Sequence, residues 1–240
     1  MSFKQRHILI LGGSSDIGLE VIKKLLKLNW KVTAHYNYNK FFLKNIKNKN
    51  LYNIFLDFSK INYKNINKIF KKKFNNNYDA IVNLIGYVDN KSYQKTDLES
   101  LIKSIKINAL LPILIQKKLV GNMLAKKWGR ILNCSSIGVK FGGGINAYNY
   151  AFSKHCLEFF PNIHKEWAKK NVLINSLRIG ITDTKLHKRM NKKMSMRKRI
   201  NLIPIKRMAK PQEISNYIVN LVVDENSYMT GQTISISGGE

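Results

Sequence analysis

The fold of this chain is decided by the stretch Ile8-Leu9-Ile10-Leu11-Gly12-Gly13-Ser14-Ser15-Asp16-Ile17-Gly18. Its four apolar residues predict a buried strand, and the glycines that follow predict a sharp turn. An amphipathic helix is expected over residues 17–28, because leucine and isoleucine recur there at helical spacing. A strand, a glycine-rich turn and a helix in this order leave backbone N–H groups and the positive end of the helix dipole free to bind a phosphate.

Short apolar runs alternate with longer helical patterns along the rest of the chain, which predicts βαβ units and a parallel sheet. Further strands are expected at residues 31–35, 53–57, 80–84, 130–134, 172–177 and 233–237. Helices are expected at 97–125, interrupted near Pro112, at 147–170, kinked at Pro161, and at 212–223, with Pro211 in the first turn. Two lysine- and asparagine-rich stretches, 39–50 and 60–77, are expected on surface helices.

No linker, repeat or change in composition divides the 240 residues. The hydrophobic fraction of 44% and the charged fraction of 23% are ordinary for a globular protein. We therefore predict a single α/β domain built on a Rossmann-like, doubly wound parallel sheet. Its nucleotide-binding half is expected at about 1–110 and its catalytic and substrate half at about 111–240.

The chain carries 42 Lys and Arg residues against 14 Asp and Glu, which gives a net charge of +28. A charge of this size suggests a polyanionic partner, such as nucleic acid or an anionic membrane. We favour codon bias instead, because lysine occurs with asparagine, isoleucine, tyrosine and phenylalanine along the whole chain, not on one arm. The sequence has no zinc finger, RNP pattern or localised basic arm, so we expect no specific nucleic-acid partner.

Cys134 and Cys156 form no CxxC pair and lie in predicted core elements, which favours a reduced, cytoplasmic chain with inert thiols. The five histidines show no HExxH spacing, so no metal site is expected. The apolar residues near the start run directly into the glycines, unlike those of a signal peptide. No run approaches the ~18–20 apolar residues of a membrane span, so we expect a soluble protein with no membrane partner.

A tyrosine and a lysine stand one helical turn apart, on one face, in Tyr150-Ala151-Phe152-Ser153-Lys154. The pattern is common by itself, and its place in the chain gives it meaning. The preceding predicted strand ends in Asn133-Cys134-Ser135-Ser136, and the following one ends in Asn175-Ser176-Leu177-Arg178-Ile179-Gly180. Near the end of the sequence stand Tyr228-Met229-Thr230-Gly231-Gln232 and Gly238-Gly239.

This order of motifs resembles the short-chain dehydrogenase/reductase family over nearly the whole chain. The resemblance implies an oxidoreductase that transfers a hydride between a nicotinamide cofactor and a carbonyl or alcohol substrate. It assigns Tyr150 as general acid and base, Lys154 as the residue that lowers the tyrosine pKa and holds the nicotinamide ribose, and Asn108 as support for a water-mediated proton relay. A serine would bind the substrate oxygen; Ser136 is favoured and Ser135 is the alternative.

The glycine-rich stretch is similar to the TGxxxGxG loop of that family, with Gly12 and Gly18 as its first and last glycines. Leu11 replaces the usual threonine and Asp16 the middle glycine. Asp16 suits a helix N-cap but repels a pyrophosphate unless its carboxylate points away. Asn83 and Gly86 are similar to the ends of the family's NNAG segment, which follows the fourth strand. A plain turn at the end of that strand is the alternative interpretation. The resemblance implies that the cofactor contacts Gly12, Ser14, Ser15, Ile17, Gly18, Asn37, Asp57, Phe58, Asn83, Gly86, Tyr150, Lys154, Gly180 and Thr184.

The choice of cofactor is indicated by the residues after the second strand, His35-Tyr36-Asn37-Tyr38-Asn39-Lys40. Sites specific for NAD usually place an acid here to bind the ribose hydroxyls. This stretch contains no acid, so a 2′-phosphate meets no repulsion and could pair with Lys40. We therefore expect NADP(H), with NAD(H) as the alternative.

The substrate is expected to be a small-molecule or carrier-bound carbonyl compound. It is either a 3-oxoacyl thioester, with an acidic carrier docked at Lys126, Lys127 and Arg130 near the site mouth, or a sugar or polyol of surface-polysaccharide synthesis. The basic, methionine-rich residues 189–199 match the family's substrate lid, and a membrane-surface or partner helix is the alternative. The family's habit implies a homotetramer or a dimer. A non-catalytic nucleotide-binding protein and a polyanion-binding protein on the same fold are the other functions left open.

Overall fold

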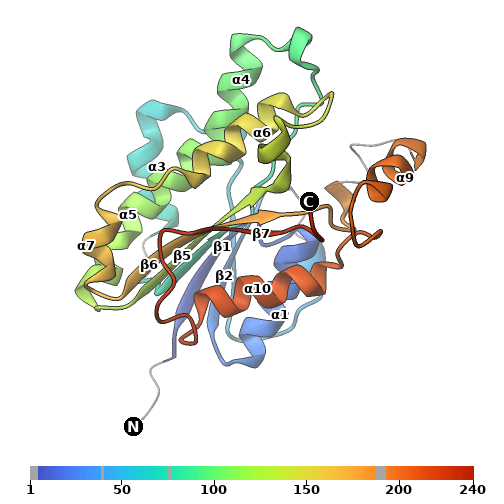
Figure 1. Ribbon diagram of the computed structural model, residues 1–240. Coiled ribbons are helices and arrows are strands. Elements are labelled where there is room, and N and C mark those ends of the chain that lie inside the picture. The colour runs from blue at the N-terminus through green and yellow to red at the C-terminus, as the bar shows by residue number, and fades with distance from the viewer. Residues whose placement is uncertain (1–4, 39–40, 75–76, 187–192) are drawn as a thin grey trace.

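A sheet of seven parallel strands forms the centre of the computed structural model, which describes residues 5–38, 41–74, 77–186 and 193–240 (Figure 1). The order in the sheet is β3-β2-β1-β4-β5-β6-β7, and every neighbouring pair is parallel. The predicted doubly wound sheet is therefore confirmed, with its switch point between β1 and β4. The strands are β1 (His7–Leu11), β2 (Lys31–Tyr36), β3 (Leu51–Phe55), β4 (Ala80–Asn83), β5 (Gly129–Ser136), β6 (Val172–Ile179) and β7 (Thr233–Ile236).

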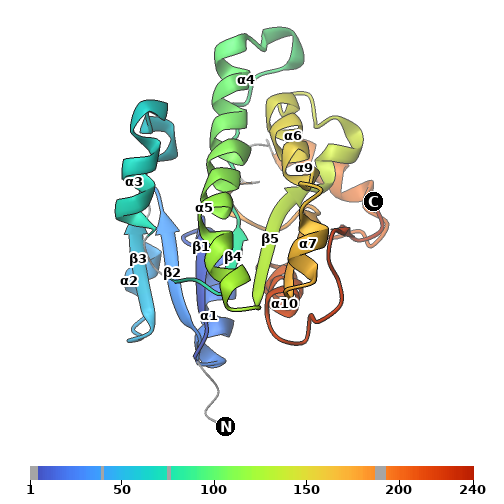
Figure 2. The ribbon, with the colours of Figure 1, turned by 90° about the vertical axis from the view of Figure 1, so that its left-hand side faces the viewer.

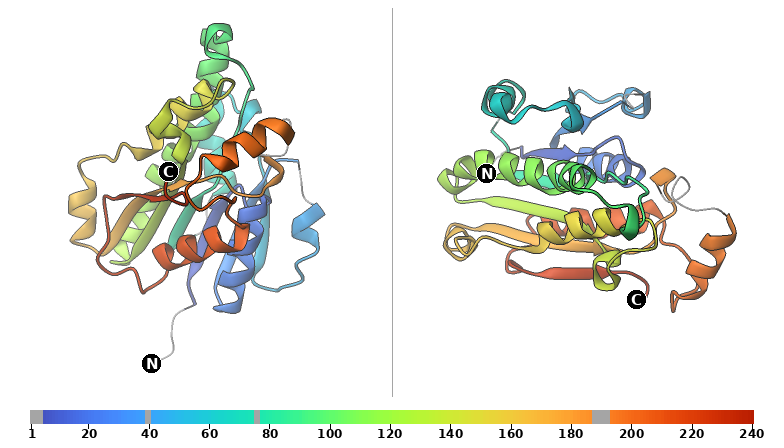
Figure 3. Two further views of the ribbon diagram at one scale, coloured as in Figure 1. Left: turned by 45° about the vertical axis from the view of Figure 1, so that its right-hand side comes forward. Right: turned by 90° about the horizontal axis from the view of Figure 1, so that it is seen from above.

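Helices cover both faces of the sheet. The α-helices of the described residues are α1 (Asp16–Lys27), α2 (Phe41–Lys44), α3 (Ile66–Lys73), α4 (Leu98–Ile105), α5 (Leu111–Ala125), α6 (Tyr148–His155), α7 (His164–Ala168), α9 (Lys193–Asn201) and α10 (Pro211–Val222). Helices α1 and α10 pack together on one face, and α3, α5 and α6 lie on the other (Figures 1 and 2). Helix α9 lies at the periphery of the domain (Figure 3). Within the part of the chain just specified, no helix is both long and apolar enough to cross a membrane.

Strand β1 shows why two layers of helices form. Ile8 and Ile10 belong to the core beneath α1 and α10, whereas Leu9 and Leu11 belong to the core beneath α5. All four side chains are fully buried. Because successive side chains of a strand point to opposite faces, an unbroken apolar run requires a sheet that is covered on both sides.

The helix predicted over 147–170 is divided in two. Helix α6 is followed by a 3-10 turn at Cys156–Glu158, and α7 begins only at His164. Pro161 explains the break, because proline donates no backbone hydrogen bond and forces the residue before it out of the helical region. The prediction of a kink inside one helix was therefore wrong. The prediction of two core cysteines was wrong for Cys156, which is only partly buried, whereas Cys134 is buried.

The helix predicted over 97–125 is interrupted, as expected. Helix α4 passes into a π-helical turn at Lys106–Leu110, where the N–H of Leu111 bonds to the carbonyl of Lys106, five residues back. Helix α5 follows directly and has Pro112 in its first turn, where a missing N–H is tolerated. The widened turn contains Asn108, which faces the site described below.

Several helices and strands of the structure differ in length from the segments predicted for them. The stretches 39–50 and 60–77 contain only α2 and α3 as α-helices among their described residues. Strand β3 ends at Phe55, so Asp57 lies beyond it and caps the 3-10 turn Phe58–Lys60. Strands β5 and β6 extend further than predicted, to Ser136 and Ile179. Of the predicted lid, residues 189–192 lie outside the described residues and 193–199 belong to α9.

The packing of α1 against the sheet can be tested with two leucines, one inside the helix and one at its end. Leu25 is fully buried, whereas the Leu28 side chain is 54% exposed at the end of the helix. We expect Leu25→Ala to lower the free energy of unfolding by about 2–5 kcal/mol, because it leaves a cavity in the core. We expect Leu28→Ala to change it by less than about 0.5 kcal/mol. Urea denaturation of both variants measures the difference, and equal losses would contradict the packing described.

Candidate active site

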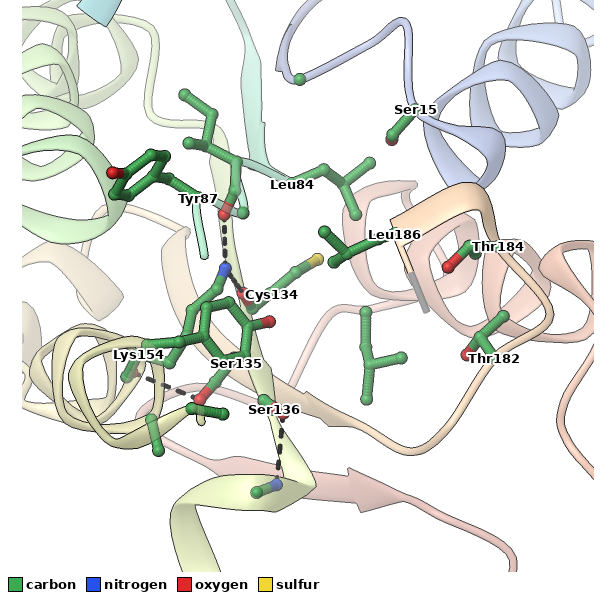
Figure 4. A pocket seen from close by; sticks show the side chains of 18 of the residues that line it. Ser15, Leu84, Tyr87, Cys134, Ser135, Ser136, Lys154, Thr182, Thr184 and Leu186 are labelled. Carbon is green, nitrogen blue, oxygen red and sulfur yellow. Dashed lines mark hydrogen bonds between the residues drawn. The ribbon is translucent and has the colours of Figure 1, made fainter. Parts of the chain in front are cut away.

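A cavity of about 1330 Å³ opens at the carboxyl ends of the strands. Its walls come from the loops that follow β1 to β6, and from α6 and the last residues of the chain (Figure 4). Because ligands of doubly wound sheets bind above the switch point, this cavity is the candidate site.

The glycine-rich turn forms one wall of the cavity. Gly12 has φ +78°, and a Cβ added to it would lie 3.0 Å from the backbone of Leu84. A Cβ on Gly18 would lie only 2.7 Å from the carbonyl oxygen of Gly13. The hydroxyl of Ser15 accepts a hydrogen bond from the N–H of Gly18 and thereby caps α1. Of the residues predicted here, Gly12, Ser14, Ser15 and Ile17 line the cavity, and Gly18 supports them from below.

Asp16 also lines the cavity beside this turn. Its carboxylate accepts a hydrogen bond from the backbone N–H of Lys185 at 2.7 Å, and the Lys185 ammonium lies 3.7 Å from its other oxygen. The expectation that Asp16 suits a helix N-cap was wrong, because Ser15 caps α1. The carboxylate in place of the family glycine is therefore paired with the segment that follows β6.

His35, at the end of β2, was not singled out from the sequence. Its Nδ1 accepts a hydrogen bond from the N–H of Gly12 at 3.2 Å, and its Nε2 lies 2.8 Å from the carbonyl oxygen of Leu56. Burial lowers the pKa of this imidazole to about 4, so it is neutral at neutral pH. No local pattern marks the residue, because both partners come from other loops.

The far end of the cavity is formed by the loops after β2 and β3. Asn37, Tyr38, Asp57 and Phe58 line it. The carboxylate of Asp57 accepts hydrogen bonds from the backbone N–H of Ser59, at 2.9 Å, and from its hydroxyl, at 2.7 Å. Lys40, the residue expected to meet a 2′-phosphate, lies outside the described residues.

Two of the residues predicted to bind the cofactor or take part in catalysis lie below the cavity instead of in its wall. Asn83 is buried, and its side-chain oxygen accepts a hydrogen bond from the N–H of Ile85 at 3.1 Å. Asn108 bonds to both the N–H and the carbonyl of Tyr87, at 2.7 and 2.9 Å, and donates to the hydroxyl of Ser153 at 2.8 Å. These side chains therefore shape the loop after β4 and hold it against α6.

Tyr150 and Lys154 project from α6 into the cavity wall, opposite Gly86 and Cys134. The Lys154 ammonium donates to the carbonyl oxygens of Ile85, at 2.5 Å, and Cys134, at 2.7 Å (Figure 4). It lies 5.8 Å from the centroid of the Tyr150 ring. A Cβ on Gly86 would lie 3.8 Å from the same ring, so the loop after β4 lies directly beside the phenol.

Burial dominates the electrostatics of this pair. It raises the pKa of Tyr150 to about 12, against the effect of a hydrogen bond with Ser136, and lowers the pKa of Lys154 to about 8. The sequence led us to expect that Lys154 lowers the tyrosine pKa. In the structure the ammonium bonds to two carbonyls instead of the phenol, so burial of the phenol outweighs it.

The two serines at the end of β5 have different surroundings. The Ser135 hydroxyl donates to the carboxylate of Glu158 at 2.7 Å, and that carboxylate also forms a two-pronged ion pair with Arg178. The Ser136 hydroxyl accepts from the N–H of Gly138 at 3.2 Å, and its influence on the phenol lowers the Tyr150 pKa against the larger effect of burial. The structure thus places Ser136 beside the phenol and ties Ser135 to the strand behind it.

The loop after β6 closes the cavity on the opposite side, where Thr182, Thr184 and Leu186 are visible in Figure 4. Gly180 and Thr184, both predicted to contact the cofactor, line the cavity. A Cβ on Gly180 would lie 2.6 Å from the Cα of Ser237, so the last strand can approach only a glycine. Arg199 of α9 forms an ion pair with Glu240 at the cavity rim.

The basic residues expected near the site mouth lie elsewhere. Arg130 stands at the amino end of β5, is buried, and donates to the carbonyls of Gly129 and Asn171. Lys126 forms an ion pair with Asp79 at 2.6 Å. Six residues of extended strand, roughly 20 Å, separate Arg130 from Ser136. Because all strands are parallel, their amino ends lie at the edge opposite the cavity, so this expectation was wrong.

Within the described residues, no group of three or more His, Cys, Asp or Glu side chains could hold a metal ion. The groups that the cavity presents to a ligand include glycine-rich backbone, hydroxyl groups and one buried ammonium, that of Lys154.

Known proteins are similar to this chain in sequence and in fold. Residues 14–240 match the protein family described as enoyl-(acyl-carrier-protein) reductase. A 3-oxoacyl-[acyl-carrier-protein] reductase of Aquifex aeolicus (strain VF5) is 30% identical over 177 residues, 72% of this chain and 71% of that protein. One of Buchnera aphidicola subsp. Schizaphis graminum is 28% identical over 100% of this chain and 98% of its own. A 3-oxoacyl (acyl-carrier-protein) reductase of Agrobacterium tumefaciens C58, solved with NADP bound, shares the fold: the TM-score is 0.84 at 20% identity, covering 98% of this chain and 94% of that one.

Proposed function

Because the chain belongs to the short-chain dehydrogenase/reductase family, we propose that it reduces the ketone of a 3-oxoacyl thioester with NADP(H) as its cofactor. The observation that carries this proposal is the grouping of Ser136, Tyr150 and Lys154 on one wall of the cavity. A hydroxyl, a phenol and an ammonium that line the same cavity wall supply the groups that protonation of a reduced carbonyl requires.

The cavity fits a dinucleotide. Gly12 and Gly18 stand where added Cβ atoms would meet the protein's own backbone at 3.0 and 2.7 Å, so glycine permits the tight turn that presents the start of α1 to a pyrophosphate. Asp57 and Phe58 suit the adenosine end, and Gly180 and Thr184 suit the nicotinamide end. A nicotinamide dinucleotide bound here would supply the hydride that reduces the carbonyl carbon.

The side chains of the cavity wall would bind and protonate the substrate's carbonyl oxygen. Reduction leaves a developing alkoxide that needs a proton, and Tyr150, with a pKa of about 12, is protonated at neutral pH and can donate one. The Ser136 hydroxyl, which lines the same cavity wall as the phenol, can hold the substrate oxygen beside it. Lys154, with a pKa of about 8, is mostly cationic at neutral pH, and its charge favours the tyrosinate that remains after proton transfer.

The cavity wall favours an acyl substrate over a sugar or polyol. Beyond Tyr150 the wall is largely apolar, which suits a hydrocarbon chain; it contains Ile137, Phe141, Ile145, Leu186 and Leu202. The relatives' names point to 3-oxoacyl thioesters. Reduction of an enoyl thioester, the activity in the family's description, is the second candidate, but it needs a proton on carbon, whereas the Ser136 and Tyr150 hydroxyls suit a developing alkoxide oxygen.

Turnover should depend on Tyr150 and not on its neighbour Tyr148. We expect Tyr150→Phe to lower the rate of acetoacetyl-thioester reduction by at least about a hundredfold, because the general acid is lost, while cofactor binding persists. Tyr148→Phe is the matched control, because Tyr148 stands on the same helix and packs against Tyr93. Steady-state assays with acetoacetyl and crotonyl thioesters measure both. Near-wild-type turnover of Tyr150→Phe would remove this residue from the mechanism, and faster crotonyl reduction would favour the enoyl activity.

NADPH should bind more tightly than NADH. Asn37 and Tyr38 line the cavity after β2, so the described residues of this loop place no carboxylate where NAD-specific sites usually have one. We expect Asn37→Asp to weaken NADPH binding at least about tenfold, roughly 1.4 kcal/mol, through charge repulsion, and to spare NADH. Fluorescence titrations of the reduced cofactors give the four dissociation constants. Tighter NADH binding by the wild type would overturn the assignment.

Two neighbouring helices leave an apolar face uncovered, and we propose that further copies of the chain cover it. Leu98, Ile102 and Leu110 are at least half exposed along α4 and the π turn, and Ile113 and Leu114 extend the face into α5. Light scattering at micromolar concentration should give the mass of four chains. Ile113→Glu should lower that mass, whereas Lys117→Glu, on the same helix, should not. A monomer mass for the wild type would refute the assembly.

A further inference from the structure

His35 is a buried titratable side chain that the proposed chemistry does not use. It is 4% exposed and lines the cavity at the end of β2. One ring nitrogen accepts the N–H of Gly12, at the start of the glycine-rich turn, and the other faces the carbonyl of Leu56, after β3. The imidazole therefore joins two loops that are separated by 44 residues of sequence but line the same cavity.

The first of these bonds orients the turn. The amide of Gly12 lies at the left-handed residue, φ +78°, on which the turn depends. The next amide, that of Gly13, donates to the backbone carbonyl of His35 at 2.8 Å. Two successive amides of the turn are thus fixed by a single residue, one through its side chain and one through its main chain.

The second bond fixes the segment at the other end of the cavity. Leu56 leads directly into Asp57 and Phe58, which line the region suited to adenosine. The imidazole also packs against the Phe58 ring, with 4.8 Å between centroids. His35 therefore fixes the distance between the glycine-rich turn and the segment that lines the region suited to adenosine.

Both bonds require one particular form of the ring. Nδ1 must be unprotonated to accept from Gly12, and Nε2 must carry the proton that Leu56 accepts. Only a neutral imidazole provides both, and burial keeps it neutral. Among amide side chains, asparagine reaches only the position of Nδ1 and glutamine only the position of Nε2, so each can replace one bond and not the other.

We propose that His35 is a positioning residue for the dinucleotide, which sets cofactor affinity by fixing the Gly12 peptide and with it the orientation of the glycine-rich turn. The inference rests on the proposed function, because it takes NADPH as the ligand. The bond to Gly12 carries the effect on affinity, and the bond to Leu56 mainly carries stability.

The test compares His35→Asn with His35→Gln by fluorescence titration with NADPH and by thermal unfolding. We expect His35→Gln to bind NADPH about tenfold more weakly, because the Gly12 amide loses its acceptor. We expect His35→Asn to stay within about threefold of the wild type, although it leaves the Leu56 carbonyl without a donor and unfolds at a lower temperature. Affinity and stability should therefore rank the two variants in opposite ways.

His7→Asn is the matched control. His7 is also held neutral by partial burial, with a pKa of about 4, and its ring bonds to Thr33 at 2.8 Å, but it lies at the amino end of β1, away from the cavity. It should lose stability and keep its NADPH affinity. Wild-type affinity in His35→Gln would overturn the inference, and so would losses of affinity in both His35 variants that follow their losses of stability.

Failure of the proposed function would be seen separately, as a wild type that binds neither NADPH nor NADH. Hydrogen exchange of the turn, residues 11–18, would then still decide the structural part of the inference. We expect these amides to exchange faster in His35→Gln than in His35→Asn. Equal protection in the two variants would mean that His35 does not order the turn.

Discussion

No side chain fits between the start of α1 and the turn that precedes it. A Cβ on Gly18 would meet the carbonyl oxygens of Gly13 and Gly12 at 2.7 and 2.8 Å, closer than real Cβ contacts. Because only glycine allows this approach, α1 can begin directly after β1 and lie flat against the sheet, where α10 packs beside it. The same contact directs the first amides of α1 into the cavity. One backbone contact therefore fixes both a layer of the fold and the phosphate-sized end of the site.

The opposite wall depends on burial rather than on close backbone contact. Lys154 is 2% exposed, and the carbonyls of Ile85 and Cys134 hold its ammonium at the end of β5. One carbonyl lies in the loop after β4 and the other within the adjacent strand β5, so the charge is placed by the sheet and not by α6 alone. Behind it, the bond of Ser135 to Glu158 ties the end of the same strand to the segment after α6. The position of Ser136 beside Tyr150 follows from this anchoring.

The sequence was sufficient to predict features that depend on residues close to one another along the chain. Apolar runs located all seven strands, and the spacing of Tyr150 and Lys154 located helix α6. It was insufficient where partners are distant: the bonds of His35 to Gly12 and Leu56, and of Asp16 to Lys185, join separate loops. Proline chemistry located a disturbance at Pro161 but not its extent. The error about Arg130 came from its nearness in sequence to Ser136, because a strand carries its two ends to opposite edges of the sheet.

The two carbonyls that hold Lys154 also restrict what its nitrogen can do. An amine attacks a thioester through its lone pair, and the product is a stable amide that would permanently block the site. In the ammonium form, two of the three N–H groups point at carbonyl oxygens, and the nitrogen has no lone pair to offer. Burial lowers the pKa of Lys154 to about 8, so the ammonium form still predominates at neutral pH. The carbonyls thus protect the lysine from acylation by the kind of substrate that the site would hold.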